Sequence, residues 1–143
     1  MKFDNYMVLE FPSKSTNEGF ARSAVAAFAA QMDPTLEELG DIRTAVSEAV
    51  TNCIVHAYRG TVGMIYITVV LSHEGGIRIV IKDKGVGIDD IDKARTPAYT
   101  TGGNERSGMG FTIMESFMTS FQVSSAPGKG TTVHMRRKLQ RRK

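Results

Sequence analysis

Three polar side chains follow one another at helical spacing near the middle of the chain. Glu48, Asn52 and His56 are four residues apart, within a segment whose apolar positions step by three or four. Because an α-helix turns once in about 3.6 residues, this spacing places the three side chains in one row. An amide oxygen is a hard ligand that suits Mg²⁺, and a carboxylate can accept a proton from an attacking hydroxyl. The row favours metal–phosphate chemistry. The alternatives are a polar helix face with chance spacing and, for His56, a structural hydrogen bond.

A carboxylate and two glycines come at the end of an apolar segment that is typical of a strand. Asp83 follows residues 77–82 and precedes Gly85 and Gly87. Glycines let the chain turn sharply and approach a ligand closely. A carboxylate there can accept a hydrogen bond from the exocyclic amine of adenine, where guanine has a carbonyl. The dinucleotide-binding fingerprint is excluded because its third glycine is replaced by Asp90. A glycine turn without a ligand remains the alternative.

A second glycine pair precedes an apolar helical segment. Gly108 and Gly110 lead into residues 111–119, and a helix that starts with glycines presents free backbone N–H groups to a phosphate. Arg106 adds a cation suited to a terminal phosphate. An ordinary glycine-rich entry to a helix is the alternative, and Gly130-Thr131 is by itself only a turn.

Two helices are expected to support the row of polar side chains. The first begins with a Ser15-x-x-Glu18 capping box and runs to about Met32. Its buried stripe is predicted to comprise Phe20, Ala24, Ala27 and Phe28. The second begins at Asp33-Pro34, a side-chain cap followed by proline, and runs to about Tyr58. Its predicted core face comprises Leu39, Ile42, Val46, Val50, Cys53 and Ala57.

The remaining elements predict the fold class. We expect strands at 6–11, 64–71, 77–82, 120–125 and 131–138, and a helix at 111–119. The intervening loop from 83 to 110 is long enough to be functional in a compact domain. The order β-α-α-β-β-loop-α-β-β predicts an α+β protein, a two-layer α/β sandwich. Its mixed, mostly antiparallel sheet should be covered by helices on one face.

Length and composition indicate one domain over residues 1–138, followed by a basic tail at 139–143. The net charge is +3, yet six of the last eight residues are cations, so the rest of the chain is net acidic. Such a tail can touch nucleic acid or acidic protein but is more often a solvated end, and we expect no direct nucleic-acid partner. No apolar run approaches ~18 residues and the start lacks a signal-peptide pattern, so we expect no membrane segment. A single cysteine, Cys53, fits a cytoplasmic protein and a small core position.

The motifs occur in one order, and together they resemble a known superfamily. Glu48-Ala-Val-Thr-Asn52 resembles the N box of the gyrase, Hsp90, histidine-kinase and MutL (Bergerat) ATP-binding domains. Asp83-x-Gly85-x-Gly87 resembles the G1 box of that superfamily, and Gly108-x-Gly110 resembles its G2 box. Gly130-Thr131 is similar to its closing Gly-Thr element. Within it the chain resembles the sporulation branch of the anti-sigma serine kinases, through Phe20-Ala21-Arg22, 46–52 and 105–115. The resemblance covers nearly the whole chain.

The resemblance implies ATP/ADP and Mg²⁺ as ligands and a role for each motif residue. Asn52 would coordinate Mg²⁺, and Glu48 would act as the base toward a serine hydroxyl. Asp83 would read adenine with Thr131 close by, and Gly85 and Gly87 would shape the base pocket. The residues that would line the lid and hold phosphates are Thr100, Thr101, Arg106, Ser107, Gly108 and Gly110. Arg106 would also stabilise charge on the transferring phosphoryl group, with an effect of roughly 10³–10⁵ in rate for comparable arginines.

The resemblance also implies partners. Such kinases form a homodimer that holds a sigma factor when ATP is bound, and they phosphorylate a small anti-anti-sigma protein on serine. Arg22 is a candidate partner contact, with simple solvent exposure as the alternative. Two other readings stay open: an ATP-gated sigma-binding module without phosphotransfer, and the sister kinases that control stress-response sigma factors. A histidine kinase is disfavoured, because the chain leaves no room for a dimerisation helix with a phospho-accepting histidine.

Overall fold

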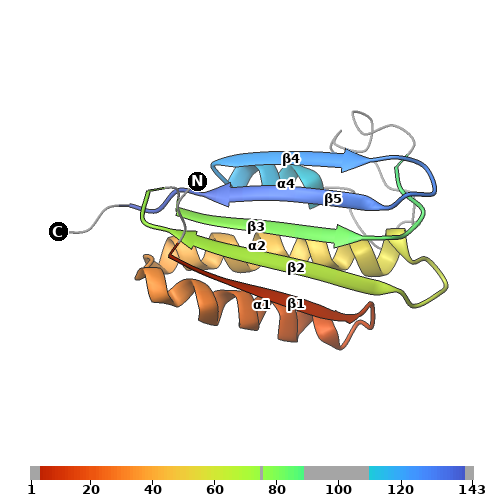
Figure 1. Ribbon diagram of the computed structural model, residues 1–143, viewed down its shortest axis with the longest axis horizontal. Helices are drawn as coiled ribbons and strands as arrows, with labels where there is room; N and C mark the ends of the chain where they lie inside the picture. Colours follow the sequence, from red (N-terminus) through yellow and green to blue (C-terminus); the bar gives the residue numbers. More distant parts are fainter. Residues whose placement is uncertain (1–3, 75, 89–109, 141–143) are drawn as a thin grey trace.

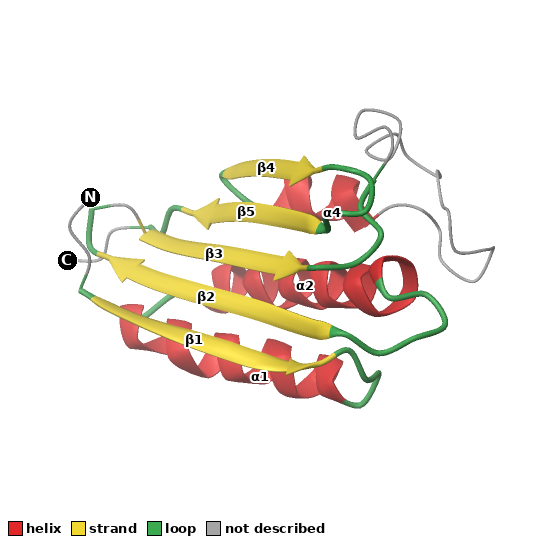
Figure 2. Ribbon diagram, turned by 45° about the vertical axis from the view of Figure 1, so that its right-hand side comes forward, coloured by secondary structure: helices red, strands yellow, loops and turns green. Residues whose placement is uncertain are grey.

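One antiparallel sheet with helices on a single face makes up the protein. The computed structural model describes residues 4–74, 76–88 and 110–140. Its sheet has the strand order β1-β2-β3-β5-β4, and the helices α1, α2 and α4 all lie behind it in Figures 1 and 2. The strands are β1 Asn5–Pro12, β2 Met64–Ser72, β3 Gly76–Asp83, β4 Ser120–Ser125 and β5 Thr131–Arg137. The predicted two-layer α+β class is confirmed; the sheet, expected to be mixed, is antiparallel in all four described pairings.

Period-two alternation along the central strands builds one wall of the core. Ile65, Ile67 and Val69 of β2 are fully buried, and each lies opposite or beside a buried residue of β3 such as Ile79 or Ile81. The alternate side chains of the same strands point to the other face of the sheet, which no described helix covers. The apolar core therefore lies between the sheet and the helices, as one-sided burial requires.

The first helix buries a face that differs from the predicted one, although the predicted Phe28 is partly buried and packs against the core. α1 (Asn17–Ala29) buries Ala21, Val25 and Ala29, whereas Phe20 is 53% exposed. Small side chains at intervals of four let α1 approach α2 closely, and a phenylalanine in that stripe would hold the helices apart. Phe20 instead lies edge-on against the ring of Phe11, at a centroid distance of 6.3 Å.

The predicted capping box of α1 is also wrong. Thr16 is the N-cap residue and makes no side-chain cap bond. The carboxylate of Glu18 instead accepts a hydrogen bond from the Ser47 hydroxyl on α2, at 2.7 Å, and pairs with Arg22. A bond between two helices has taken the place of the local cap.

The second helix starts later than predicted. After the single 3₁₀ turn η1 (Ala30–Met32), Asp33 adopts a left-handed backbone with φ 52°. Thr35 then caps α2 (Leu36–Asn52) through a reciprocal capping box with Glu38. Proline at position 34 therefore precedes the cap rather than opening the helix. The predicted core face of α2 is confirmed: Leu39 packs against the core, and the other predicted residues are buried, namely Ile42, Val46, Val50, Cys53 and Ala57.

A π-helical turn, η2 (Cys53–Ala57), continues α2 directly. Its hydrogen bond runs from the N–H of Tyr58 to the carbonyl of Cys53, at 3.0 Å. Because a π turn is wider than an α turn, the α-helical spacing that placed His56 in a row with Asn52 does not continue past Asn52. The last helix, α4 (Gly110–Phe117), lies beside α2 and leads into β4. None of the helices in these described ranges has the length and apolarity that a membrane crossing needs.

Candidate nucleotide site

The end of α2 and the start of α4 meet at the predicted metal–phosphate residues. Gly110, the first residue of α4, lies against Asn52 and Glu48: a methyl group there would be 3.2 Å from Asn52 Oδ1 and 3.4 Å from Glu48 Oε1. Both α2 side chains are half-buried. The fold thus brings an amide oxygen, a carboxylate and the positive end of a helix to one place, which suits a metal-bound phosphate.

The predicted adenine-reading carboxylate lies buried at the end of β3. Asp83 is 4% exposed, and its Oδ1 accepts hydrogen bonds from the N–H groups of Gly85, at 2.9 Å, and Thr131, at 3.1 Å. Its Oδ2 accepts a weaker one from the Cys53 thiol, at 3.5 Å. Burial is the largest influence on this carboxyl and raises the pKa of Asp83 above its usual value, against the three hydrogen bonds that lower it. A further donor to Oδ2, such as an exocyclic amine, would favour the charged form.

The two glycines after Asp83 sit where no side chain fits. A methyl group at Gly85 would overlap the carbonyl oxygen of Ala57 in η2. Gly87 has φ +78°, and a methyl there would overlap the carbonyl oxygen of Ala126 in the closing hairpin. The N–H of Val86 donates to the same Ala57 carbonyl at 3.1 Å. The glycine loop is therefore held between the end of the second helix and the last hairpin.

The end of α2 and the end of β3 lie together, because Cys53, the residue after Asn52, contacts Asp83. We predicted Cys53 as a small core residue, and it is buried; burial is also the main cause that raises the pKa of its thiol well above the usual value. Its contact with Asp83 was not predicted. No local pattern links residues that are 30 positions apart.

Two hydroxyl groups that the sequence analysis did not single out hold the site together. Ser125 Oγ donates to the carbonyl of Gly130, shares a hydrogen bond with Thr131 Oγ1 at 2.8 Å, and accepts from the N–H of Ile88. Tyr58 OH donates to the carbonyl of Met64 and accepts from the N–H of Lys84 next to Asp83. Only the abundance of Ser and Tyr at strand and helix ends could have suggested them.

The predicted lid residues Thr100, Thr101, Arg106, Ser107 and Gly108 lie outside the described residues. Within the described ranges, no group of three or more His, Cys, Asp or Glu side chains is placed to hold a metal ion by itself.

Comparison with known proteins assigns the chain to a family. The family model of the histidine kinase-like ATPase domain matches residues 11–137. The anti-sigma F factor of Caldanaerobacter subterraneus subsp. tengcongensis is 55% identical over 136 residues, which cover 94% of each chain. That of Clostridium perfringens strain SM101 is 53% identical over 95% of this chain and 98% of its own.

The chain belongs to the anti-sigma F factor family of histidine kinase-like ATPase domains.

Solved structures share the fold at lower identity. The RsbU and RsbW domains of a Mycobacterium tuberculosis protein match with a TM-score of 0.72 and 19% identity, over 97% of this chain and 34% of that one. The mycobacterial sensor histidine kinase MprB matches with a TM-score of 0.56 and 16% identity, over 92% of this chain and 100% of its own. A histidine kinase-like ATPase domain implies ATP or ADP as a ligand.

Proposed function

We propose that this member of the anti-sigma F factor family inhibits a sporulation sigma factor, sigma F, and is also a protein serine kinase. In this proposal it uses Mg-ATP to phosphorylate a serine of its antagonist, a small anti-anti-sigma protein. The observation that carries the kinase half is the meeting of Glu48, Asn52 and the start of α4 at Gly110. A nucleotide-gated binding module would need the ligand contacts but no carboxylate at that place.

The residues present fit a magnesium nucleotide. Asn52 offers a hard oxygen ligand beside the positive end of α4, and Mg²⁺ commonly takes one or two protein ligands and completes its shell with phosphate oxygens and water. Bound there, the ion would neutralise phosphate charge. Asp83 is proposed to accept the exocyclic amine of adenine, with Thr131 beside it and Gly85 and Gly87 shaping the pocket.

Glu48 is proposed as the base. Its carboxylate takes the proton of the substrate serine hydroxyl while the serine oxygen bonds to the γ-phosphorus and the bond from that phosphorus to the leaving ADP oxygen breaks. Arg106 is proposed to offset the charge on the transferring group, and Thr100, Thr101, Ser107 and Gly108 to hold phosphates. These five roles rest on the motif resemblance alone.

The protein partners are proposals of the same kind, and a cytoplasmic location would follow from them. Homodimerisation is proposed through β1, an edge strand whose Tyr6 and Val8 expose large side chains on the face that no described helix covers. Arg22 is proposed as a sigma-factor contact. Its guanidinium is partly exposed and so open to a partner, and both carboxylate oxygens of Glu18 hold it in place. Residues 141–143 of the predicted tail lie outside the described residues, and no role is proposed for them.

Label transfer tests the proposed function. Incubation with γ-labelled Mg-ATP and a candidate anti-anti-sigma protein should place acid-stable label on the second protein. Glu48→Gln should abolish the transfer and leave ATP binding in place, because the amide cannot accept the proton. Glu37→Gln, the same change at an exposed position of α2, is the matched control and should transfer label like the wild type. Full transfer by Glu48→Gln would refute the base assignment, and ATP binding without transfer by the wild type would favour the gated binding module.

A further inference from the structure

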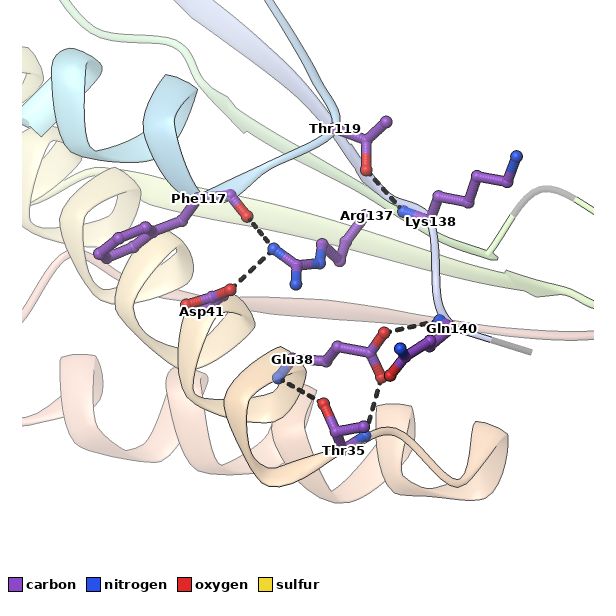
Figure 3. A network of polar contacts seen from close by, with 8 residues as sticks. All are labelled: Thr35, Glu38, Asp41, Phe117, Thr119, Arg137, Lys138 and Gln140. Atoms are coloured by element: carbon purple, nitrogen blue, oxygen red, sulfur yellow. Dashed lines mark hydrogen bonds and ion pairs between the residues drawn. The ribbon is translucent and has the colours of Figure 1, made fainter. Parts of the chain in front are cut away.

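The segment that follows β5 touches both helices of the nucleotide site. Residues 137–140, here called the C-terminal clasp, run from the last residue of β5 past the end of α4 to the start of α2, as Figure 3 shows. Leu139 packs against the core, although the sequence analysis assigned it to the solvated tail. The clasp lies at the end of the two helices that is far from Gly110.

Arg137 makes the central contacts of the clasp. Its Nη1 donates to the carbonyl oxygen of Phe117, the last residue of α4, and pairs with Oδ2 of Asp41 on α2, both at 2.7 Å. The Arg137 and Asp41 side chains are only 19% and 20% exposed, so water screens the pair less than it would at the surface. The carbonyl at a helix end has no partner within its helix, and a cation there also matches the helix dipole. One guanidinium thus joins the C-terminal end of α4 to α2.

Two further polar contacts hold the clasp in place. Glu38 of α2 is 6% exposed, and its carboxylate accepts from the backbone N–H of Gln140, at 2.6 Å, and of Thr35, at 2.8 Å. The N–H of Lys138 donates to the hydroxyl of Thr119, two residues after α4 ends, at 2.8 Å. The segment that carries Arg137 is therefore anchored on both sides of it.

The opposite end of α4 is the start of the phosphate site. α4 has eight residues and is about 12 Å long, so a shift of its C-terminal end moves the whole helix, including Gly110. At Gly110 the fit is close enough that a single methyl group would touch Asn52 and Glu48. A small displacement of α4 along α2 would therefore change the space in which phosphate oxygens and a metal ion must fit.

We propose that Arg137 is a positioning residue of the nucleotide site, which holds α4 at its place along α2 and so keeps Gly110 against Asn52 and Glu48. The inference rests on the proposed function, which places the phosphates at that junction. Asp83 and Thr131, which are proposed to frame the base, stand on β3 and β5 and do not depend on α4. Loss of Arg137 should consequently weaken the binding of phosphates and spare the binding of the base.

Arg137→Met tests this, with Mg-ATP and adenosine as probes in titration calorimetry of the full chain. The affinity for Mg-ATP should fall about five- to tenfold, within the usual range of coupling between sites, and that for adenosine by less than about twofold. Arg136→Met is the matched control: among the described residues the Arg136 side chain has no hydrogen-bond or ion-pair partner, and this variant should bind like the wild type. Arg137→Lys, which keeps the charge and one donor group, should recover part of the loss.

The outcomes separate the two ideas. Equal losses for Mg-ATP and adenosine, or wild-type affinity for both in a folded Arg137→Met, would overturn the positioning role and leave the proposed function standing. A wild-type chain that binds adenosine no more weakly than Mg-ATP would instead refute the phosphate site itself. Melting curves report whether each variant folds. If Arg137→Met does not fold, Asp41→Asn replaces it as the test, because this change keeps the bond between Arg137 and Phe117. Asp41→Asn should weaken the binding of Mg-ATP by a smaller factor and leave the binding of adenosine unchanged. Equal effects on the two ligands in this variant would overturn the inference.

Discussion

One methyl group at the junction of α2 and α4 tests the geometry of the site most directly. We predict that Gly110→Ala keeps the fold and loses much of the affinity for Mg-ATP. Gly110 is helical, without the positive φ found at five other glycines, so alanine adds no backbone strain there. The added carbon would lie 3.1 Å from Asn52 Nδ2, 3.2 Å from Asn52 Oδ1 and 3.4 Å from Glu48 Oε1.

These distances set the expected size of the effect. Contacts of 3.1–3.4 Å oblige the neighbouring side chains to move by a few tenths of an ångström, and Mg²⁺ requires its oxygen ligands at about 2.0–2.1 Å in near-octahedral geometry. Mg-ATP requires both side chains in place against the methyl group, so the crowding, which typically costs about 1–3 kcal/mol, falls on binding and corresponds to roughly 5- to 150-fold in affinity. Without the ligand, Asn52 and Glu48 can move aside, and alanine favours a helix over glycine by up to about 1 kcal/mol, so the melting temperature should stay close to the wild-type value.

Calorimetric titration with Mg-ATP, alongside thermal melting, measures both effects. Gly40→Ala is the matched control, because it makes the same change inside α2 where a methyl group meets nothing within 4 Å. It should raise stability and leave Mg-ATP affinity at the wild-type value. If Gly110→Ala binds Mg-ATP as tightly as the wild type does, the phosphates lie elsewhere and the assigned junction is wrong.

Three further predictions follow from single contacts. Asn52→Ala should lower the affinity for Mg-ATP far more than that for adenosine, since only the former needs the amide oxygen; equal effects in calorimetry would place the metal elsewhere. Adenosine affinity should weaken as pH falls through the pKa of Asp83, which burial raises, because the amine binds the ionised carboxylate. The unliganded fold should show the opposite trend and lose stability as pH rises through that pKa, because the folded state favours the protonated carboxyl. Asp83→Asn should remove this pH dependence, and a dependence that persists would implicate another group. Thr35→Ala should lower the free energy of unfolding by about 1 kcal/mol in denaturant titrations, because it removes the capping box with Glu38; an unchanged midpoint would show that the cap is dispensable.

Sequence reasoning succeeded where a single local rule decides the outcome. The strands at 64–71 and 77–82 and the core face of α2 follow from period and hydrophobicity alone, and the structure contains both strands and has the predicted face of α2 in the core. It failed where a contact between helices replaced a local signal. Ser15-x-x-Glu18 and Thr35-x-x-Glu38 are both capping patterns, yet only the second forms, because Glu18 has a better partner in Ser47 on another helix.

Local reasoning also misplaced a large side chain. Phe20 was expected in the core because helical periodicity placed it on the predicted buried stripe, but the stripe that faces α2 consists of small residues. The distance between two helices depends on both of their surfaces, which a period within one helix does not contain.

What the sequence determined by itself was the order of elements and the set of candidate residues for nucleotide binding, because both depend on residue type and short spacing. Only the tertiary structure decided which of them meet. It placed Gly110 against Asn52 and Glu48, joined Cys53 and Thr131 to Asp83, and passed Arg137 between the far ends of α2 and α4. These contacts span 20 to 100 positions of the chain, so they arise from sheet order and helix packing rather than from any local pattern.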